Sequence, residues 1–278
     1  MRAAAEEAMP RIFTVVCLTL FTAMPAIAGL SEGVAALRIG DYATALVELR
    51  PTAEQGSAEA QLYMGALYEN GRGVAVDYAE AAKWYRMAAD QNQAAAQFSI
   101  GLLYAKGRGV VQDDAVAADW LRKAAEQGLA SAEYDLSIMY TNGKGVARDD
   151  VQALAWAQKA AEQDVPGAQY LVGEAYRQGR GVAQSNGAAA EWFRKAADRG
   201  YGPAQYGLGV LYLRGHGVPE SRVEAYKWIY LAAQRMQGKA REEAIDALGR
   251  VGNAMSEIER NRAMERVRQW TPGRAAAQ

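Results

Sequence analysis

The chain has 278 residues, of which 50% are hydrophobic and 23% are charged, and its formal net charge at pH 7 is −1. Because the sequence contains neither a strongly basic domain nor a basic helix, nothing in it indicates a nucleic acid as a partner. The abundance of alanine and the scarcity of proline, with 7 residues in the whole chain, favour helical structure.

Residues 1–28 have the form of a secretory signal peptide. Arg11 precedes a short apolar run at residues 12–23, Pro25 breaks that run, and the residues at 26–28 form a small-x-small cleavage pattern. The apolar run is too short for a stable membrane span. We therefore expect cleavage after residue 28 and a periplasmic or secreted mature protein. The alternative is an uncleaved N-terminal anchor.

The start of this leader is open. Glu6 and Glu7 are unusual in a signal peptide, and translation from Met9 instead of Met1 would remove them. Cys17, the one cysteine of the chain, lies inside the leader. Cleavage would leave a mature chain without cysteine, which fits an oxidising compartment and a fold held together by packing alone.

Residues 29–57 form a degenerate capping repeat ahead of the regular ones. Its segment 41–43 matches residues 77–79 of the first full repeat. Glu48 stands where the other repeats have a tryptophan, and we expect Pro51 to interrupt the second helix of this cap.

Three markers recur every 36 residues between residues 58 and 236. A turn of the form Gly-x-Gly-Val begins at Gly71, Gly107, Gly143, Gly179 and Gly215. Each turn is followed by a tryptophan, at Trp84, Trp120, Trp156, Trp192 and Trp228, and then by an Ala-Ala pair. A repeat of this length indicates a solenoid of stacked units, which usually presents a surface rather than a catalytic pocket.

Each unit is predicted to be a pair of helices. In the second unit the apolar spacing predicts a first helix over residues 94–106, which Gly107 ends. Asp113 or Asp114 is a suitable N-cap for a second helix that runs to about residue 127. A small residue recurs in the middle of the first helix, at Gly65, Gly101, Ser137, Gly173 and Gly209. We expect a tryptophan or tyrosine of the neighbouring helix to lie over it.

The chain is predicted to end in a helical cap over residues 237–271 and a disordered tail over 272–278. The period is lost after residue 235, as expected of a solenoid end. The packing stripe of this cap is expected to consist of Met255, Ile258, Met264, Val267 and Trp270.

The repeat unit resembles the Sel1-like repeat, a relative of the tetratricopeptide repeat. The likeness rests on Ala-x-x-x-Leu-Gly-x-x-Tyr, Gly-x-Gly-Val, an acidic residue and Ala-x-x-Trp-x-x-x-Ala-Ala-x-x-Gly, and it covers about residues 41–236. The resemblance implies an all-α, right-handed α/α solenoid of 36-residue helix-turn-helix repeats with helical caps. It also implies a scaffold or adaptor for protein partners, in envelope signalling or assembly. One branch of the family carries paired cysteines and is linked to β-lactam binding, but no repeat here contains a cysteine.

Positions that differ between copies while sharing one helix face are candidates for recognition, because positions identical in all copies serve the fold. In tetratricopeptide-like stacks the first helix of each unit lines the concave groove. We expect a groove formed by Tyr63, Ser99, Leu102, Asp135, Ile138, Leu171, Glu174 and Val210. Its ligand would be an extended peptide or a partner helix. The alternative is that these positions vary under weak constraint.

A cation or histidine stands between the paired glycines of every turn. These residues, Arg72, Arg108, Lys144, Arg180 and His216, are expected to form a cationic ridge along one edge of the stack. The ridge could bind an acidic surface such as a polysaccharide or anionic lipid head groups. The favoured alternative is that each cation complements the dipole at a helix C-terminus, worth ~0.3–1 kcal/mol.

The sequence gives no sign of catalysis. His216 is the only histidine, so neither a histidine-based triad nor a multi-histidine metal site can be built. We therefore expect no catalytic residue, no metal site and no cofactor, and a non-enzymatic exported scaffold for a protein or peptide partner. The alternatives are a cell-wall or β-lactam hydrolase of the same repeat family and a secreted host-binding factor.

Overall fold

The computed structural model describes residues 24–272, which form an all-α solenoid without strands in that range. The predicted fold class is confirmed. Most of the expected signal peptide and residues 273–278 of the expected tail lie outside the described residues. The helices are α1 (Met24–Ile39), α2 (Tyr42–Glu54), α3 (Ala58–Asn70), α4 (Tyr78–Asp90), α5 (Ala94–Lys106), α6 (Asp114–Glu126), α7 (Ala130–Asn142), α8 (Asp150–Glu162), α9 (Pro166–Gln178), α10 (Asn186–Asp198), α11 (Gly202–Arg214), α12 (Arg222–Arg235), α13 (Gly238–Asn253) and α14 (Glu257–Gln269).

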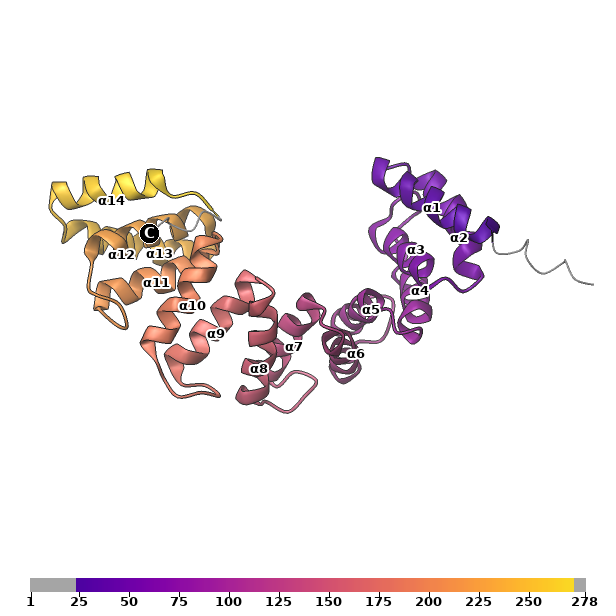
Figure 1. The fold of residues 1–278 in the computed structure, drawn as a ribbon, viewed down its shortest axis with the longest axis horizontal. Helices are drawn as coiled ribbons and strands as arrows, with labels where there is room; N and C mark the ends of the chain where they lie inside the picture. Colours follow the sequence, from indigo (N-terminus) through magenta and orange to yellow (C-terminus); the bar gives the residue numbers. More distant parts are fainter. Residues whose placement is uncertain (1–23, 273–278) are drawn as a thin grey trace, which may run out of the picture.

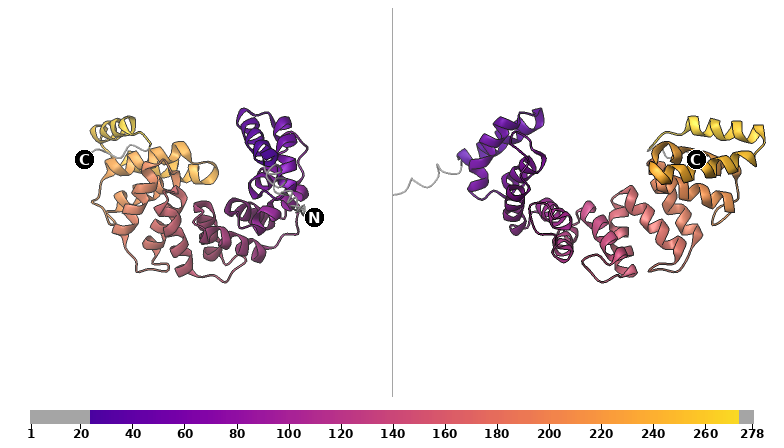
Figure 2. Two further views of the ribbon diagram at one scale, coloured as in Figure 1. Left: turned by 45° about the vertical axis from the view of Figure 1, so that its right-hand side comes forward. Right: turned by 180° about the vertical axis from the view of Figure 1, so that it is seen from behind.

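The helices follow one another along an open arc, with α1 and α14 at its two ends (Figures 1 and 2). Each helix from α1 to α12 packs on the next one along the chain, and α14 packs back on α12. We call α3, α5, α7, α9 and α11 the A helices, and α4, α6, α8, α10 and α12 the B helices. In the middle of the arc in Figure 1, α5 and α7 lie toward its hollow, and α6 and α8 lie farther out.

Glycine ends every A helix, as the sequence predicted. The helix α5 spans the predicted residues 94–106, and Gly107 adopts a left-handed conformation with φ of 63°. Asp113 is the N-cap of α6, where its carboxylate accepts hydrogen bonds from the backbone N–H groups of Ala115 and Val116 at 2.9 and 3.0 Å. These two signals fix the bounds of both helices.

The second glycine of each turn joins neighbouring units. At Gly109 a Cβ atom would lie 2.1 Å from the carbonyl carbon and oxygen of Tyr78, the first residue of the preceding B helix. The same close approach occurs at Gly73, Gly145, Gly181 and Gly217. Since any side chain at this position would collide with backbone, the turn serves as a spacer between units.

Small buried residues let the helices pack closely. The Ala-Ala pairs of all five B helices are buried, and Trp84, Trp120 and Trp228 are buried beside them. Trp156 and Trp192 are half-buried and pack against the same kind of cluster. The core is therefore a series of clusters, each shared between neighbouring units.

A row of buried side chains links each A helix to the helix before it. Gln61, Gln97, Gln169 and Gln205 donate Nε2 hydrogen bonds to carbonyls near the end of that helix, at 2.9, 3.3, 3.3 and 3.0 Å. In the third unit the position holds Glu133, which is buried and accepts a hydrogen bond from Gln163 Nε2 at 2.8 Å. Sequence analysis did not identify this row, although its 36-residue period is visible.

The two caps differ in part from expectation. Pro51 does not interrupt α2, which continues from Tyr42 to Glu54. The proline lies near the end of the helix, and the residue whose carbonyl loses its partner, Val47, is 69% exposed, so water can replace the missing N–H. In the C-terminal cap Met255 is buried, but Ile258 is 73% exposed and is not part of the packing stripe.

Candidate functional site

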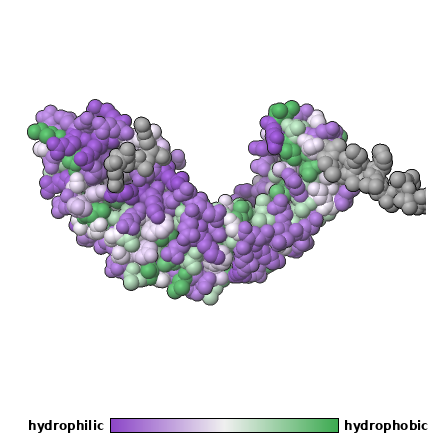
Figure 3. All heavy atoms as spheres, viewed as in Figure 1, coloured by the Kyte–Doolittle hydropathy of each residue, from purple (hydrophilic) through white to green (hydrophobic). Residues whose placement is uncertain are grey.

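The A helices carry all eight predicted groove residues, and each of these is half-buried. Figure 3 shows polar and apolar residues mixed along the arc. Half-burial is what a groove lining requires, because such side chains are fixed on one side and reachable from the other. The structure places the eight residues in one row of helices, but only Leu171, Glu174 and Val210 line the pockets described below.

The residue after each tryptophan lies opposite the small residue in the middle of the A helix of the same unit. This position holds Tyr85, Leu121, Ala157, Phe193 and Ile229. A Cβ atom on Gly65, Gly173 or Gly209 would lie 2.5, 2.5 or 2.6 Å from the side chain of Tyr85, Phe193 or Ile229. The predicted close approach over the small residue is therefore present, but in these units it is made by the residue that follows the tryptophan.

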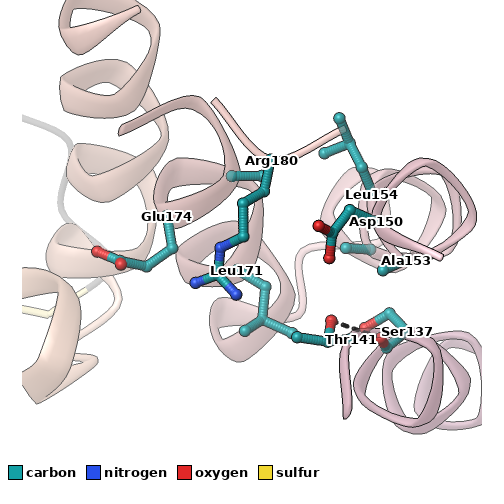
Figure 4. Close-up of a pocket in the computed structure, with 10 residues that line it drawn as sticks. Ser137, Thr141, Asp150, Ala153, Leu154, Leu171, Glu174 and Arg180 are labelled. Atoms are coloured by element: carbon teal, nitrogen blue, oxygen red, sulfur yellow. Dashed lines mark hydrogen bonds between the residues drawn. The ribbon is translucent and has the colours of Figure 1, made fainter. Parts of the chain in front are cut away.

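The third unit departs from this pattern. Ala157 replaces the large side chain, and Ser137 replaces the glycine. A pocket of about 40 Å³ lies here between α7, α8 and α9, and Leu154 and Leu171 form part of its wall (Figure 4). The pocket occupies the junction that a tyrosine, leucine, phenylalanine or isoleucine approaches in the other units.

Three charged residues, Asp150, Glu174 and Arg180, line this central pocket, and two further arginines bind its carboxylates. Arg148 Nη2 donates to both carboxylate oxygens of Asp150, at 3.2 and 3.0 Å. Arg177 binds Glu174 through Nε at 2.9 Å and Nη2 at 2.8 Å. The side chain of Arg180 extends between the carboxylates of Asp150 and Glu174 (Figure 4), and its guanidinium makes no hydrogen bond or ion pair within residues 24–272. The site therefore presents one guanidinium without a partner of its own.

A larger pocket of about 510 Å³ lies between α9 and α11. Tyr170, Glu174 and Val210 line it together with Tyr206 and Arg214. Burial raises the pKa of Tyr170 to about 12, with a further contribution from the negative charge of Glu174. Sequence analysis missed Tyr170 and Tyr206, and the aromatic residues that recur at this position in four of the five A helices were the available signal.

Asp135 is a predicted groove residue whose carboxyl group is electrostatically perturbed. Burial raises the pKa of its carboxyl group, and the charge of Lys106 on the neighbouring A helix lowers it in part. Glu174, which the sequence grouped with Asp135, is instead tied to Arg177. The two acidic residues are therefore not equivalent, since Asp135 is held only by a more distant cation.

The cationic ridge is engaged with the fold in three of its five positions. In these units the ridge cation contacts the first residue of the helix that precedes its own A helix. Arg72 and Arg108 lie 5.2 and 5.3 Å from the ring centres of Tyr42 and Tyr78, and Lys144 Nζ lies 3.2 Å from Asp114 Oδ1. Binding of an acidic surface by this ridge stays a prediction, and these contacts favour a structural role.

The described residues hold no group of three or more His, Cys, Asp or Glu side chains that could bind a metal ion. None of the helices between residues 24 and 272 has the length and apolar character of a membrane span. The lone His216 is exposed in the last Gly-x-Gly-Val turn.

The sequence model of the Sel1 repeat matches residues 58–93, 94–129, 130–165, 166–201 and 202–235. Among solved structures, a Sel1 repeat protein from Oxalobacter formigenes is 30% identical, with a TM-score of 0.76, and the match covers 87% of this chain and 99% of that one.

Two other matches are more distant. A protective antigen of uropathogenic Escherichia coli with the SLR fold is 23% identical (TM-score 0.44; 88% and 76% covered). Immunity protein Pa5087 from Pseudomonas aeruginosa is 20% identical (TM-score 0.43; 81% and 81% covered). No curated protein matches significantly. The five matched repeats and the Oxalobacter structure show that this chain belongs to the Sel1 repeat family.

Proposed function

We propose that this chain is an exported, non-enzymatic scaffold that binds a segment of another protein along its concave groove. Sel1 repeat proteins are generally protein-interaction scaffolds. The observation that carries the proposal is the degree of burial of the variable positions on the A helices. All eight are half-buried, whereas the repeated Ala-Ala pairs are buried. Variation is thus concentrated where a ligand could touch it.

The occupant we favour is an extended peptide or a partner helix. The two pockets at the C-terminal half of the groove share Glu174, so they lie side by side along the surface. Adjacent pockets of mixed polarity suit successive side chains of one extended segment better than a single small molecule. Envelope signalling or envelope assembly is the setting that an exported scaffold of this kind would fit.

The proposal of a hydrolase has weaker support. The carboxylates of Asp150 and Glu174 line the same pocket, but each is bound by an arginine two or three residues away. Each of the two carboxylates is therefore already engaged by a cation of this chain. No observation of the described residues favours the host-binding alternative over a partner in the cell envelope.

Site-specific photo-crosslinking in cells tests the groove. A photoreactive phenylalanine analogue would replace Leu102 or Ile138 in the groove, and Asp119 or Gln152 on exposed B-helix surface would serve as matched positions. We expect adducts with one partner protein from the groove positions only. Equal adducts from both faces, or adducts from the B helices alone, would contradict the proposal.

Export has its own test. Fractionation of the cells followed by N-terminal sequencing should give a periplasmic or secreted protein that begins at Gly29. Helix α1 begins at Met24, so cleavage there would shorten this helix by its first five residues. A protein that keeps its leader in the membrane fraction would support the uncleaved anchor instead.

A further inference from the structure

The central pocket lies where Ala157 replaces a larger side chain, and Arg180 lines it. We propose that it is a recognition site for an acidic side chain of the partner segment, whose carboxylate binds Arg180. This inference rests on the proposed function and adds the chemical class of one contact. The supporting observations concern the walls of the pocket, its charges and the equivalent arginines of other units.

The walls favour the aliphatic stem of a short side chain. Ala157, Leu154 and Leu171 provide apolar surface. The two hydroxyl groups nearby are already engaged, because Ser137 Oγ donates to the Tyr134 carbonyl at 2.7 Å and Thr141 Oγ1 donates to the Ser137 carbonyl at 2.8 Å. At about 40 Å³, the pocket has less than a tenth of the volume of the pocket of about 510 Å³ between α9 and α11. A short side chain such as that of aspartate or glutamate suits a space of this size.

The charges at the mouth favour a carboxylate. Asp150 and Glu174 are paired with Arg148 and Arg177, so these four charges cancel. Arg180 adds one positive charge, and its guanidinium makes no hydrogen bond or ion pair among residues 24–272. A guanidinium presents two parallel N–H donors that match the two oxygens of a carboxylate. A partner aspartate or glutamate would therefore supply the missing counter-charge.

Arg180 is free because the residue it would contact is already bound. In the other units with a cation at this position, that cation contacts the first residue of the helix that precedes its own A helix: Arg72 with Tyr42, Arg108 with Tyr78 and Lys144 with Asp114. In the fourth unit the equivalent first residue is Asp150, which is held by Arg148. Arg180 is instead directed over the pocket toward Glu174 and Leu171 (Figure 4).

The experiment starts from a displayed library of random nonapeptides selected on the purified protein. We expect the enriched peptides to share one Asp or Glu. A synthetic peptide of the most enriched sequence and its amide counterpart, with that residue changed to Asn or Gln, are then compared by fluorescence anisotropy. The acidic peptide should bind at least tenfold more tightly, and the difference should shrink at high salt.

Three variants locate the contact. Arg180→Met removes the charge and should abolish the preference for the acidic peptide. Arg108→Met makes the same change at the equivalent position of another unit and should leave the preference intact. Ala157→Val fills the pocket and should weaken the binding of the acidic peptide. Circular dichroism checks that this variant is folded. If Ala157→Val does not fold, the two arginine variants decide the question.

The outcomes separate the two proposals. Enriched peptides without an acidic residue, or an acid preference that survives Arg180→Met, would overturn the central-site inference and leave groove binding standing. An equal loss in Arg108→Met and Arg180→Met would also overturn it, because the effect would then belong to the ridge. Failure to enrich any peptide would contradict groove binding and would remove this inference with it.

Discussion

Leu171 of α9 and Ala157 of α8 line the same pocket, and the large side chain of Leu171 lies next to the space that the small Ala157 leaves open. The reverse arrangement occurs in the following unit, where a Cβ atom on Gly207 would be only 3.1 Å from the ring of Phe193. A large residue after the tryptophan is thus matched by a small one on the next A helix. The variation at Leu171 therefore has a packing cause as well as a proposed role in recognition.

This complementarity predicts non-additive mutations in the third unit. Ala157→Phe alone should destabilise the protein by ~1–3 kcal/mol, because the ring would collide with Ser137 and Leu171. Combining it with Ser137→Gly and Leu171→Ser should recover part of that loss. We expect a coupling of ~0.5–3 kcal/mol, measured by urea denaturation of Ala157→Phe, the Ser137→Gly/Leu171→Ser variant and the combination. Additive effects would show that the three positions do not share one space.

The sequence was sufficient to predict the helical repeat but not the contents of each junction. The bounds of α5 followed from apolar spacing and from Gly107, because caps and glycines act locally. The role of the residue after the tryptophan could not be read in the same way, because its partners Ser137 and Leu171 lie on two other helices. The available signal was that, from copy to copy, a small residue after the tryptophan goes with a large residue on the next A helix, and the reverse. This relation can be interpreted only when the contacts between the two positions are known.

The contacts of the ridge cations and the effect of Pro51 on α2 could not be predicted from the sequence for a related reason. The ridge appeared as a uniform row in the sequence. In the structure Arg108 contacts Tyr78, whereas the guanidinium of Arg180 has no hydrogen-bond or ion-pair partner among the described residues 24–272, because this contact depends on the first residue of another helix. Similarly, Pro51 remains within α2 because the affected carbonyl, that of Val47, belongs to an exposed residue. Both outcomes are set by tertiary surroundings rather than by local preference.

The spacer glycine of the turn should tolerate no side chain. Both Gly109 and Gly128 have positive φ, 69° and 82°, but a Cβ atom would meet the backbone of Tyr78 at 2.1 Å in the first case and nothing within 4 Å in the second. Gly128→Ala should cost only the ~1–2 kcal/mol of left-handed strain. Gly109→Ala should cost clearly more and should lower the thermal midpoint further, as measured by circular dichroism. Equal effects would mean that strain alone explains the glycine.

The buried Glu133 should lower the stability of the fold, and glutamine at this position should raise it. Glu133→Gln would restore the amide donor that the four equivalent glutamines possess and would keep an acceptor for Gln163. Since one such hydrogen bond contributes ~1 kcal/mol, we expect a gain of that order at neutral pH. The reverse change, Gln97→Glu, should destabilise the protein and serves as the control.

The gain at Glu133 should depend on pH in a defined direction. Burial raises the pKa of this carboxyl group above its usual value of 4.5 in the folded state, so the folded protein binds the proton more readily than the unfolded chain does. The stability of the natural protein relative to Glu133→Gln should therefore be greatest at acid pH. It should fall as the pH rises through 4.5 and the raised pKa, and then become constant. A difference that grows toward acid pH in favour of glutamine would contradict this sign.

The stability of the C-terminal cap should depend on Trp270 and not on Ile258. The ring of Trp270 meets that of Trp228 edge-on at 6.5 Å between centroids, and the guanidinium of Arg235 lies 4.5 Å from the Trp270 centroid. Trp270→Ala should therefore cost ~2–4 kcal/mol of local stability. Ile258 is 73% exposed, so Ile258→Ala should have little effect and provides a control in the same C-terminal cap.

Hydrogen exchange can show which helices are destabilised when the Trp270 contact is lost. In a solenoid each unit is stabilised by contact with its neighbours, so loss of the Trp270 contact should speed exchange in α12 and α11 first. The helices α3 to α6, at the other end of the arc, should keep the protection of the unaltered protein. Faster exchange throughout the chain would mean that the solenoid unfolds as one cooperative body rather than unit by unit from its opened end.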